Sequence, residues 1–158
     1  TIAARDDWDV LVIAIGTNSF SGTDGATQQR ETAAQYGEKY WRFIETIRDR
    51  WPNKPIIAMT PVLNRYDILG IVNVNGETAQ NYREAITRAV RERQRSDRRL
   101  KLLDGPAFVG EPLHLLVTDL VHPNDWGMRR MGEGVAAALK PLLREAAQAR
   151  PRTTTKAP

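Results

Sequence analysis

Cysteine is absent from the sequence, and so is any long hydrophobic run. Without cysteine the chain can form no disulfide, bind no zinc through thiolates and use no thiol nucleophile. The longest apolar run, residues 10–15, has the length of a strand, whereas a membrane-spanning helix needs about 20 such residues. We therefore expect no membrane partner. The sequence leaves the cellular compartment open.

Aromatic residues are also scarce, and none lies in the most basic segment, residues 88–101. Nucleic-acid-binding surfaces commonly combine basic side chains with aromatic ones that stack on bases. We therefore interpret this segment as a solvated helix end, despite the net charge of +4. Nucleic-acid binding ranks last among the functions considered, and no nucleic-acid partner is expected.

Three short apolar segments have the composition of buried strands, and they lie at residues 9–15, 55–60 and 100–103. Between them, apolar residues recur at the spacings of three and four that are typical of helices. Such an alternation favours right-handed βαβ crossovers, which build a parallel sheet with helices on both faces. We predict an α/β domain over residues 1–149 and a disordered polar tail over residues 150–158.

Proline and polar capping residues set the predicted limits of the helices. Pro52 ends the first helix, and Thr78 is a suitable N-cap for the second. Asn124 or Asp125 is expected to cap the last helix. Pro141 is expected to kink that helix or restart it.

Three predicted loops follow the carboxyl ends of the three strands, at residues 16–25, 61–76 and 104–124. Ligands of open α/β sheets bind outside the carboxyl ends of the strands. The topology therefore predicts where a functional site lies without indicating its chemistry.

The most informative segment is Asp119-Leu-Val-His122-Pro123, in the last of these loops. A tight turn there would let the carboxylate of Asp119 accept a hydrogen bond from Nδ1–H of His122. This bond fixes the imidazole tautomer and leaves Nε2 free as a general base. Pro123 favours an extended backbone at His122 and removes one backbone donor.

Two other interpretations of this segment stay open. Asp119 could simply cap the turn, with His122 an ordinary loop histidine. A metal ion could also bind Asp119, His122 and Asp125. A second histidine ligand is lacking, because His114 lies among leucines and is expected to pack in the core. We expect no metal and no cofactor.

Gly16-Thr17-Asn18, at the end of the first strand, is the second candidate element. The side chain of Asn18 could donate Nδ2–H to an oxyanion. Gly16 would let the chain turn and would let a substrate approach the backbone. A turn-forming asparagine would produce the same short sequence, so this element is weak evidence by itself.

Taken together, two segments resemble conserved blocks of the GDSL/SGNH hydrolases. The segment VLVIAIGTNSF is similar to the block in which an apolar strand leads into Gly-x-Asn. The segment TDLVHPNDWGMRRM is similar to the block Asp-x-x-His-Pro followed by a helix. The resemblance covers the chain apart from its tail. It implies a flavodoxin-like, three-layer α/β/α fold with a parallel sheet of about five strands.

By this resemblance the chain is the C-terminal part of a serine esterase. His122 would be the general base, Asp119 its orienting carboxylate and Asn18 an oxyanion-hole donor. The residues that would line the substrate pocket are Gly16, Thr17, Ser19, Phe20 and Pro61. The substrate would be a small-molecule or carbohydrate ester with a small acyl group, acetyl above all. Lipase, thioesterase and acyltransferase activities stay open, because one triad serves them all.

The nucleophile block of that family, Gly-Asp-Ser, has no counterpart in the sequence. The serines are Ser19, Ser21 and Ser96, and none follows Gly-Asp. The resembled fold has two further strands at its N-terminal end, without which the strand at residues 9–15 would be an exposed edge. We therefore expect an N-terminal segment, in the same or a separate chain, to supply the serine. The alternative is a catalytically dead binding module or relic.

Overall fold

The structure, a computed structural model, describes residues 5–21, 31–109 and 115–149 of the 158-residue chain. Two sequence-based predictions, the polar tail at residues 150–158 and the packing of His114, lie outside the described residues.

Three parallel strands form the central sheet, in the order β1-β2-β3. They are β1 (Leu11–Ala14), β2 (Ile56–Met59) and β3 (Leu100–Leu103). All four residues of β2 are buried, as expected for a strand with a neighbour on each side and helices on both faces. The predicted parallel direction of the strands is confirmed.

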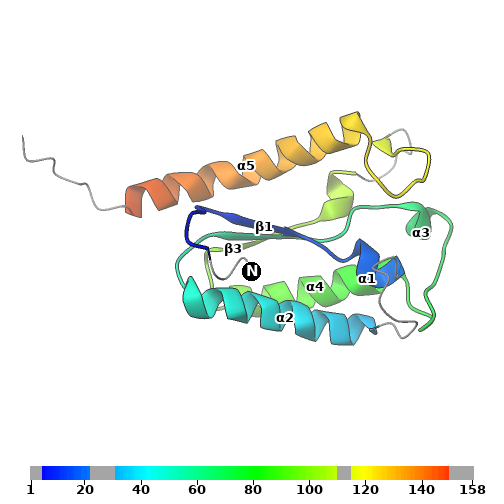
Figure 1. Cartoon of the computed structure of the whole chain (residues 1–158), viewed down its shortest axis with the longest axis horizontal. Coiled ribbons are helices and arrows are strands. Elements are labelled where there is room, and N and C mark those ends of the chain that lie inside the picture. Colours follow the sequence, from blue (N-terminus) through cyan, green and yellow to red (C-terminus); the bar gives the residue numbers. More distant parts are fainter. Residues whose placement is uncertain (1–4, 22–30, 110–114, 150–158) are drawn as a thin grey trace, which may run out of the picture.

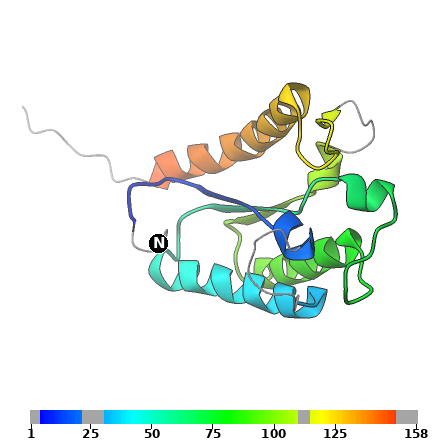
Figure 2. The same ribbon diagram turned by 45° about the vertical axis from the view of Figure 1, so that its right-hand side comes forward.

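Helices cover both faces of the sheet, which confirms the three-layer α/β/α arrangement. Figures 1 and 2 show α2 (Ala33–Arg50) and α4 (Ala79–Gln94) side by side on one face. On the opposite face lies α5 (Asp125–Ala149). Capping boxes begin α2 at Thr32 and α4 at Thr78, the second as predicted.

Apolar side chains form two separate clusters. The larger cluster joins the sheet to α2 and α4, and its fully buried members include Ile44, Ile47, Ile56, Tyr82, Ile86, Val90 and Leu100. The smaller cluster consists of Val62, Val109, Leu115 and Leu116, with Phe108, Leu120 and Met131 packed against it. Two of its members, Leu115 and Leu116, belong to the segment that leads into α5. This cluster therefore supports the predicted site rather than the centre of the sheet.

Two short helices occupy segments that we predicted as loops. The first, α1 (Thr17–Ser21), follows β1, and the second, α3 (Arg65–Ile68), lies in the connection between β2 and α4. Both predictions were wrong, because one turn of helix is too short to show an apolar stripe. A single 3-10 turn, Gly105–Ala107, follows β3.

The last helix begins as predicted. Oδ1 of Asn124 accepts a hydrogen bond from the backbone N–H of Gly127 at 3.1 Å, which is the geometry of an N-cap. The helix continues through Pro141 to Ala149, so it does not restart at the proline. Within the described residues, no helix is both long and apolar enough to cross a membrane.

The outer edge of β1 is open. No strand pairs with this side of β1 among the described residues. Val12, which pairs in register with the fully buried Ile57, is 38% exposed, and Ile15 is 49% exposed. Because paired residues of neighbouring parallel strands face the same side of a sheet, the face that is fully covered at Ile57 is partly open at Val12.

Candidate active site

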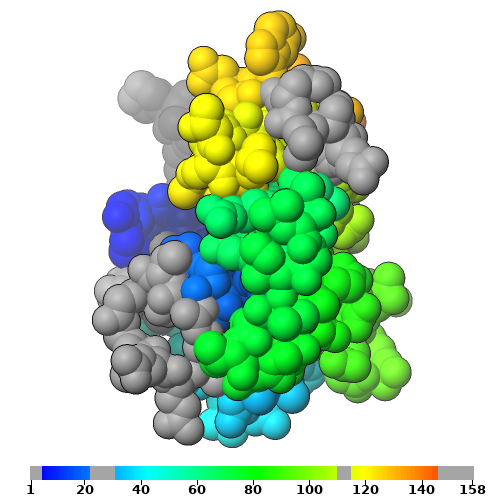
Figure 3. All heavy atoms as spheres, turned by 90° about the vertical axis from the view of Figure 1, so that its right-hand side faces the viewer, coloured from blue at the N-terminus to red at the C-terminus, as the bar shows by residue number. Residues whose placement is uncertain are grey.

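Three segments from distant parts of the sequence gather at the carboxyl end of the sheet. They are α1 after β1, α3 after β2, and the segment of residues 115–124 before α5 (Figure 1). Figure 3 looks onto this end of the molecule, with residues 115–124 (yellow) above α1 (blue) and α3 (green). The structure thus confirms that these segments share one end of the fold.

A tight turn at residues 119–122, here called the Asp–His turn, joins the two predicted catalytic side chains. Nδ1 of His122 lies 2.6 Å from Oδ2 of Asp119. The other carboxylate oxygen, Oδ1, accepts the backbone N–H groups of Val121 at 2.8 Å and of His122 at 3.0 Å. The carboxylate therefore receives three N–H groups from two residues, Val121 and His122, an arrangement that a turn this short permits.

These hydrogen bonds also set the charge of Asp119. The backbone N–H of His122, followed by its ring and the N–H of Val121, lowers the pKa of Asp119 from 3.8 to about 2. An ionised carboxylate only accepts hydrogen bonds, so Nδ1 of His122 must carry the proton. The His122 side chain is 75% exposed, so the ring nitrogen that does not face Asp119, Nε2, is accessible to solvent.

Neighbouring backbone groups hold the Asp–His turn in place. Leu120 has a positive φ of 56°, which side-chain-bearing residues rarely adopt. Its N–H donates to the carbonyl of Val117 at 2.9 Å, and its carbonyl accepts the N–H of Arg65 at 2.6 Å. On the far side of the turn, the N–H of Val117 donates to the carbonyl of His122 at 2.9 Å.

Gly16 and Asn18 lie where β1 passes into α1. Gly16 has a φ of +132°, and a Cβ at this position would come within 2.8 Å of Cγ of Pro61. Only glycine suits both the backbone and the space, as the sequence suggested. Asn18 is exposed on α1, at the same end of the sheet as the Asp–His turn. Among the described residues, no hydrogen bond joins Asn18 to His122.

The other predicted substrate-lining residues differ in accessibility. Thr17 and Ser19 are half-buried beside Asn18, and Pro61 is buried against Gly16. Phe20 is only 3% exposed, and its ring packs edge-on against Tyr66 and Tyr82 at centroid distances of 5.0 and 5.6 Å. Phe20 therefore belongs to the larger core cluster and presents almost no surface to a ligand.

None of the three serines is bonded to His122 in the part of the chain that the structure describes. Ser21 lies on α1, and its hydroxyl donates to the carbonyl of Asn18 at 3.4 Å. Ser96 follows α4, and its hydroxyl donates to the carbonyl of Arg93 at 3.3 Å. Ser96 lies four residues before the start of β3, at the amino end of the sheet and away from the Asp–His turn.

The metal interpretation gains no support from the described ranges. Within them no group of three or more histidine, aspartate and glutamate side chains is placed to hold a metal ion. Asp119 already uses both oxygens on N–H groups of the Asp–His turn.

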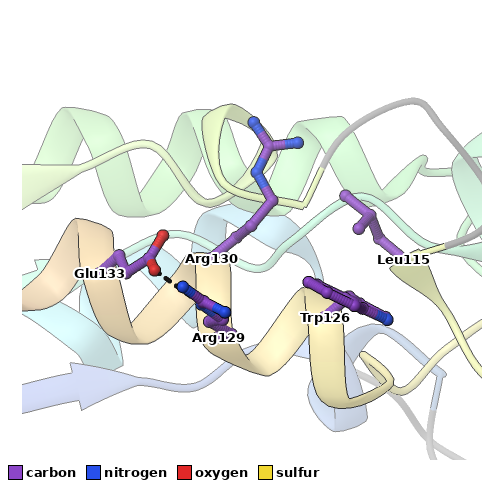
Figure 4. Close-up of a pocket in the computed structure, with 5 residues that line it drawn as sticks. All are labelled: Leu115, Trp126, Arg129, Arg130 and Glu133. Carbon is purple, nitrogen blue, oxygen red and sulfur yellow. Dashed lines mark hydrogen bonds and ion pairs between the residues drawn. The ribbon is translucent and has the colours of Figure 1, made fainter.

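A surface depression of about 450 Å³ lies along the first turns of α5 (Figure 4). It is lined by Leu115, Trp126, Arg129, Arg130 and Glu133. Arg129 is held by an ion pair with Glu133 at 2.9 Å, while Arg130 points away from that pair. Neither member of the Asp–His turn lines this depression, so we do not include it in the site.

Sequence reasoning missed Arg83, whose buried side chain holds the connection between β2 and α3. Its Nε donates to the carbonyl of Pro61 at 2.8 Å, and its Nη2 donates to that of Val62 at 3.0 Å. A signal was present, since Arg83 follows Ala79 by four residues and precedes Ile86 by three, inside the apolar stripe of α4.

Comparison with known proteins agrees with this geometry. Residues 2–130 match the GDSL-like lipase/acylhydrolase family. The chain belongs to that family. No curated protein sequence matches the chain. The chain of this GDSL-like protein does match solved structures, each less than 25% identical to it, and these support the fold alone.

Three of those structures illustrate the range of the fold. A salicylyl-acyltransferase from a tetracycline biosynthetic pathway has a TM-score of 0.69 and 23% identity, over 88% of this chain and 40% of its own. A family 3 carbohydrate esterase from Talaromyces cellulolyticus has a TM-score of 0.64 and 18% identity, over 87% and 59%. A family two carbohydrate esterase from Clostridium thermocellum, in complex with cellohexaose, has a TM-score of 0.61 and 20% identity, over 85% and 36%. The GDSL-like chain thus spans less than two thirds of each of these structures.

Proposed function

We propose that this chain contributes the base and the oxyanion donor of a serine esterase that cleaves small acyl esters. The observation that carries the proposal is the Asp–His turn, in which an ionised Asp119 holds the proton on Nδ1 of an exposed His122. An imidazole in this state has a free Nε2 and a fixed orientation, the two properties that a general base for a hydroxyl nucleophile requires.

In the reaction that we infer, Nε2 of His122 takes the proton of a serine hydroxyl as its oxygen attacks the ester carbonyl. The tetrahedral oxyanion accepts a hydrogen bond from Nδ2–H of the Asn18 side chain. Its collapse expels the alcohol, which takes the proton from His122 and leaves an acyl-serine. Water then attacks this intermediate and gives a proton to His122, and His122 passes that proton to the departing serine oxygen as the acid is released.

The serine itself is proposed to come from polypeptide outside these 158 residues, in the same or a separate chain. Two observations support this proposal. None of the three serines donates to His122 among the described residues, and the outer edge of β1 has no strand beside it there. A strand added at this edge would bring its own carboxyl end next to α1 and the Asp–His turn.

An acetyl ester on carbohydrate is the substrate that we propose. The support comes from the kinds of protein that share the fold, two carbohydrate esterases and an acetyl esterase crystallised with acetate. The salicylyl-acyltransferase makes acyl transfer to another alcohol the competing reaction. The preference for acetyl esters of carbohydrate is measured by comparing the rate of acetate release from acetylated oligosaccharides with the rates of hydrolysis of p-nitrophenyl acetate and p-nitrophenyl butyrate.

The deciding experiment uses the complete polypeptide that contains this chain. It should hydrolyse p-nitrophenyl acetate and bind a fluorophosphonate covalently at serine. His122→Ala should lower kcat by roughly 10⁴-fold or more, and Asp119→Asn by about 10³- to 10⁴-fold, because the amide favours the wrong tautomer.

Asp125→Asn is the matched control, an exposed carboxylate three residues beyond His122 with no place in the proposed reaction. It should retain the parent rate. Parent rates in His122→Ala would refute the esterase proposal, and absence of both hydrolysis and labelling would favour the binding module. Loss of activity in Asp125→Asn, restored by a divalent metal, would favour the metal site instead.

A further inference from the structure

Arg83 lies on α4 and is only 4% exposed. Its guanidinium group forms a two-pronged ion pair with Asp67 on α3, with Nη1–Oδ1 at 2.7 Å and Nη2–Oδ2 at 2.6 Å. The same group donates to the carbonyls of Pro61 and Val62. The planar guanidinium group has enough fixed N–H donors to bind the carboxylate and both carbonyls at once, which the single ammonium group of a lysine cannot do. Arg83 therefore ties both ends of residues 61–67 to α4.

Asp67 passes this restraint to the first turn of α3. Its Oδ2 also accepts the backbone N–H of Asn64 at 3.1 Å. Oδ1 of Asn64, a residue only 1% exposed, accepts the N–H of Tyr66 at 3.0 Å. Between these two groups lies the N–H of Arg65, which donates to the carbonyl of Leu120 at 2.6 Å. Hydrogen bonds at Asn64, Arg65 and Tyr66, joined by the backbone of these three residues, thus link Arg83 and Asp67 to the Asp–His turn.

Leu120 is the residue of the Asp–His turn that most needs such support. Its φ of 56° is left-handed, so a relaxed leucine would return to negative φ. Because Leu120 lies between Asp119 and His122, that change would rotate the carboxylate away from Nδ1. The Leu120 side chain packs on the smaller core cluster, and Arg65 fixes its carbonyl.

We propose that Arg83 is a positioning residue for the esterase reaction proposed above. Through Asp67 and the N–H of Arg65, it keeps Leu120 left-handed and so keeps the proton of His122 on Nδ1. Arg83 itself touches neither His122 nor Asp119 among the described residues.

A second buried ion pair provides the control. Arg48 on α2 is 5% exposed, and its Nε lies 2.5 Å from Oδ2 of Asp97. Like Arg83, it also donates to two backbone carbonyls, those of Trp51 and Lys54. These two residues precede β2, whereas residues 61–67 follow it, so the two pairs lie at opposite ends of the sheet.

The experiment compares Arg83→Met with Arg48→Met in the 158-residue chain. Thermal unfolding and the ¹⁵N resonances of the His122 ring are measured for both at a pH where the ring is neutral. Both variants should unfold at lower temperature, because Arg83→Met removes the ion pair of the half-buried Asp67 and Arg48→Met leaves the buried Asp97 with only the longer contact to Arg93, at 3.8 Å. Only Arg83→Met should shift the Nδ1 resonance from its protonated toward its unprotonated position, with a matching shift at Nε2.

Equal ring spectra in the two variants would refute the positioning role. Should Arg83→Met fail to fold, Arg83→Lys and Arg48→Lys replace the pair. Lysine keeps the charge near Asp67 but cannot serve both carbonyls, so Arg83→Lys should give a partial shift and Arg48→Lys none.

Activity supplies a second readout that separates this inference from the esterase function. In the complete polypeptide, Arg83→Met should lower kcat by roughly 10- to 100-fold at unchanged KM, because a small misplacement of the base affects the chemical step. A shifted ring spectrum in a protein without hydrolase activity would uphold the positioning role and refute the function. An unshifted ring spectrum in an active hydrolase would refute the positioning role and uphold the function.

Discussion

Asp119 is an exposed carboxylate with an unusually full set of donors. Its side chain is 44% exposed, yet two backbone N–H groups and one ring N–H converge on it. Water competes with surface hydrogen bonds, so their effect here is less on stability than on orientation. The carboxylate fixes which nitrogen of His122 is protonated, and this assignment decides whether the ring can act as a base.

Acidification should open the Asp–His turn at an unusually low pH. The pKa of Asp119 in the folded chain is about 2, below its ordinary value of 3.8, so its hydrogen bonds stabilise the fold above that ordinary value. This contribution decreases as the pH falls from 3.8 through about 2. Amide resonances of Val121 and His122, followed by NMR during acid titration, should share a midpoint near 2.

Asp119→Asn is the control for that titration, because an amide does not ionise. Its Val121 amide should show no such transition. A midpoint at the ordinary carboxyl value in the parent chain would mean that the three N–H groups do not bind Asp119 in solution.

At the scale of elements, three glycines of α5 have different surroundings. A Cβ on Gly127 would overlap the backbone carbonyl of Leu115, in the strand-like segment that leads to the Asp–His turn. A Cβ on Gly134 would overlap the ring of Phe108. Gly132 has open space around it. The first two glycines allow α5 to approach its neighbours closely, and the third has no such role.

Gly127→Ala and Gly132→Ala should therefore change stability in opposite directions. Gly127→Ala should destabilise the fold by about 1–3 kcal/mol, because the overlapping carbonyl is backbone and cannot turn aside. Gly132→Ala should stabilise it by up to about 1 kcal/mol through helix propensity alone. Urea unfolding of the two variants measures both changes. Equal midpoints would show that α5 does not pack against residue 115 as described.

The elements that the sequence predicted well are those with a long or strong pattern. The three strands, α2, α4 and the start of α5 follow from apolar spacing and capping residues. The short α1 and α3 do not, although Asn64 and Asp67 have the spacing of a capping box. The Asp119–His122 bond was predictable because both residues lie in one turn. The bond from Arg65 to Leu120 joins residues far apart in sequence, and no local pattern indicates it.

At the scale of the whole molecule, the sheet is asymmetric. Val12 on β1 is 38% exposed, and Ile15, the residue after this strand, is 49% exposed. An open edge of apolar residues pairs readily with another chain. The 158-residue chain should therefore self-associate through β1 when it is alone, whereas a polypeptide that adds a strand at this edge should not.

Val12→Lys distinguishes these two situations, because it should reduce association of the 158-residue chain but lower the stability of a polypeptide with an added strand. In the 158-residue chain Val12 is partly exposed, so lysine should reduce concentration-dependent association in sedimentation velocity without loss of stability. Val74→Lys is the matched control, since Val74 is 70% exposed in the connection before α4 and should leave association unchanged. In the complete polypeptide, an added strand would bury position 12, and lysine there should cost about 3 kcal/mol because its charge would be unpaired. Unchanged stability of Val12→Lys in the complete polypeptide would mean that nothing covers β1, and the proposed source of the serine would then be wrong.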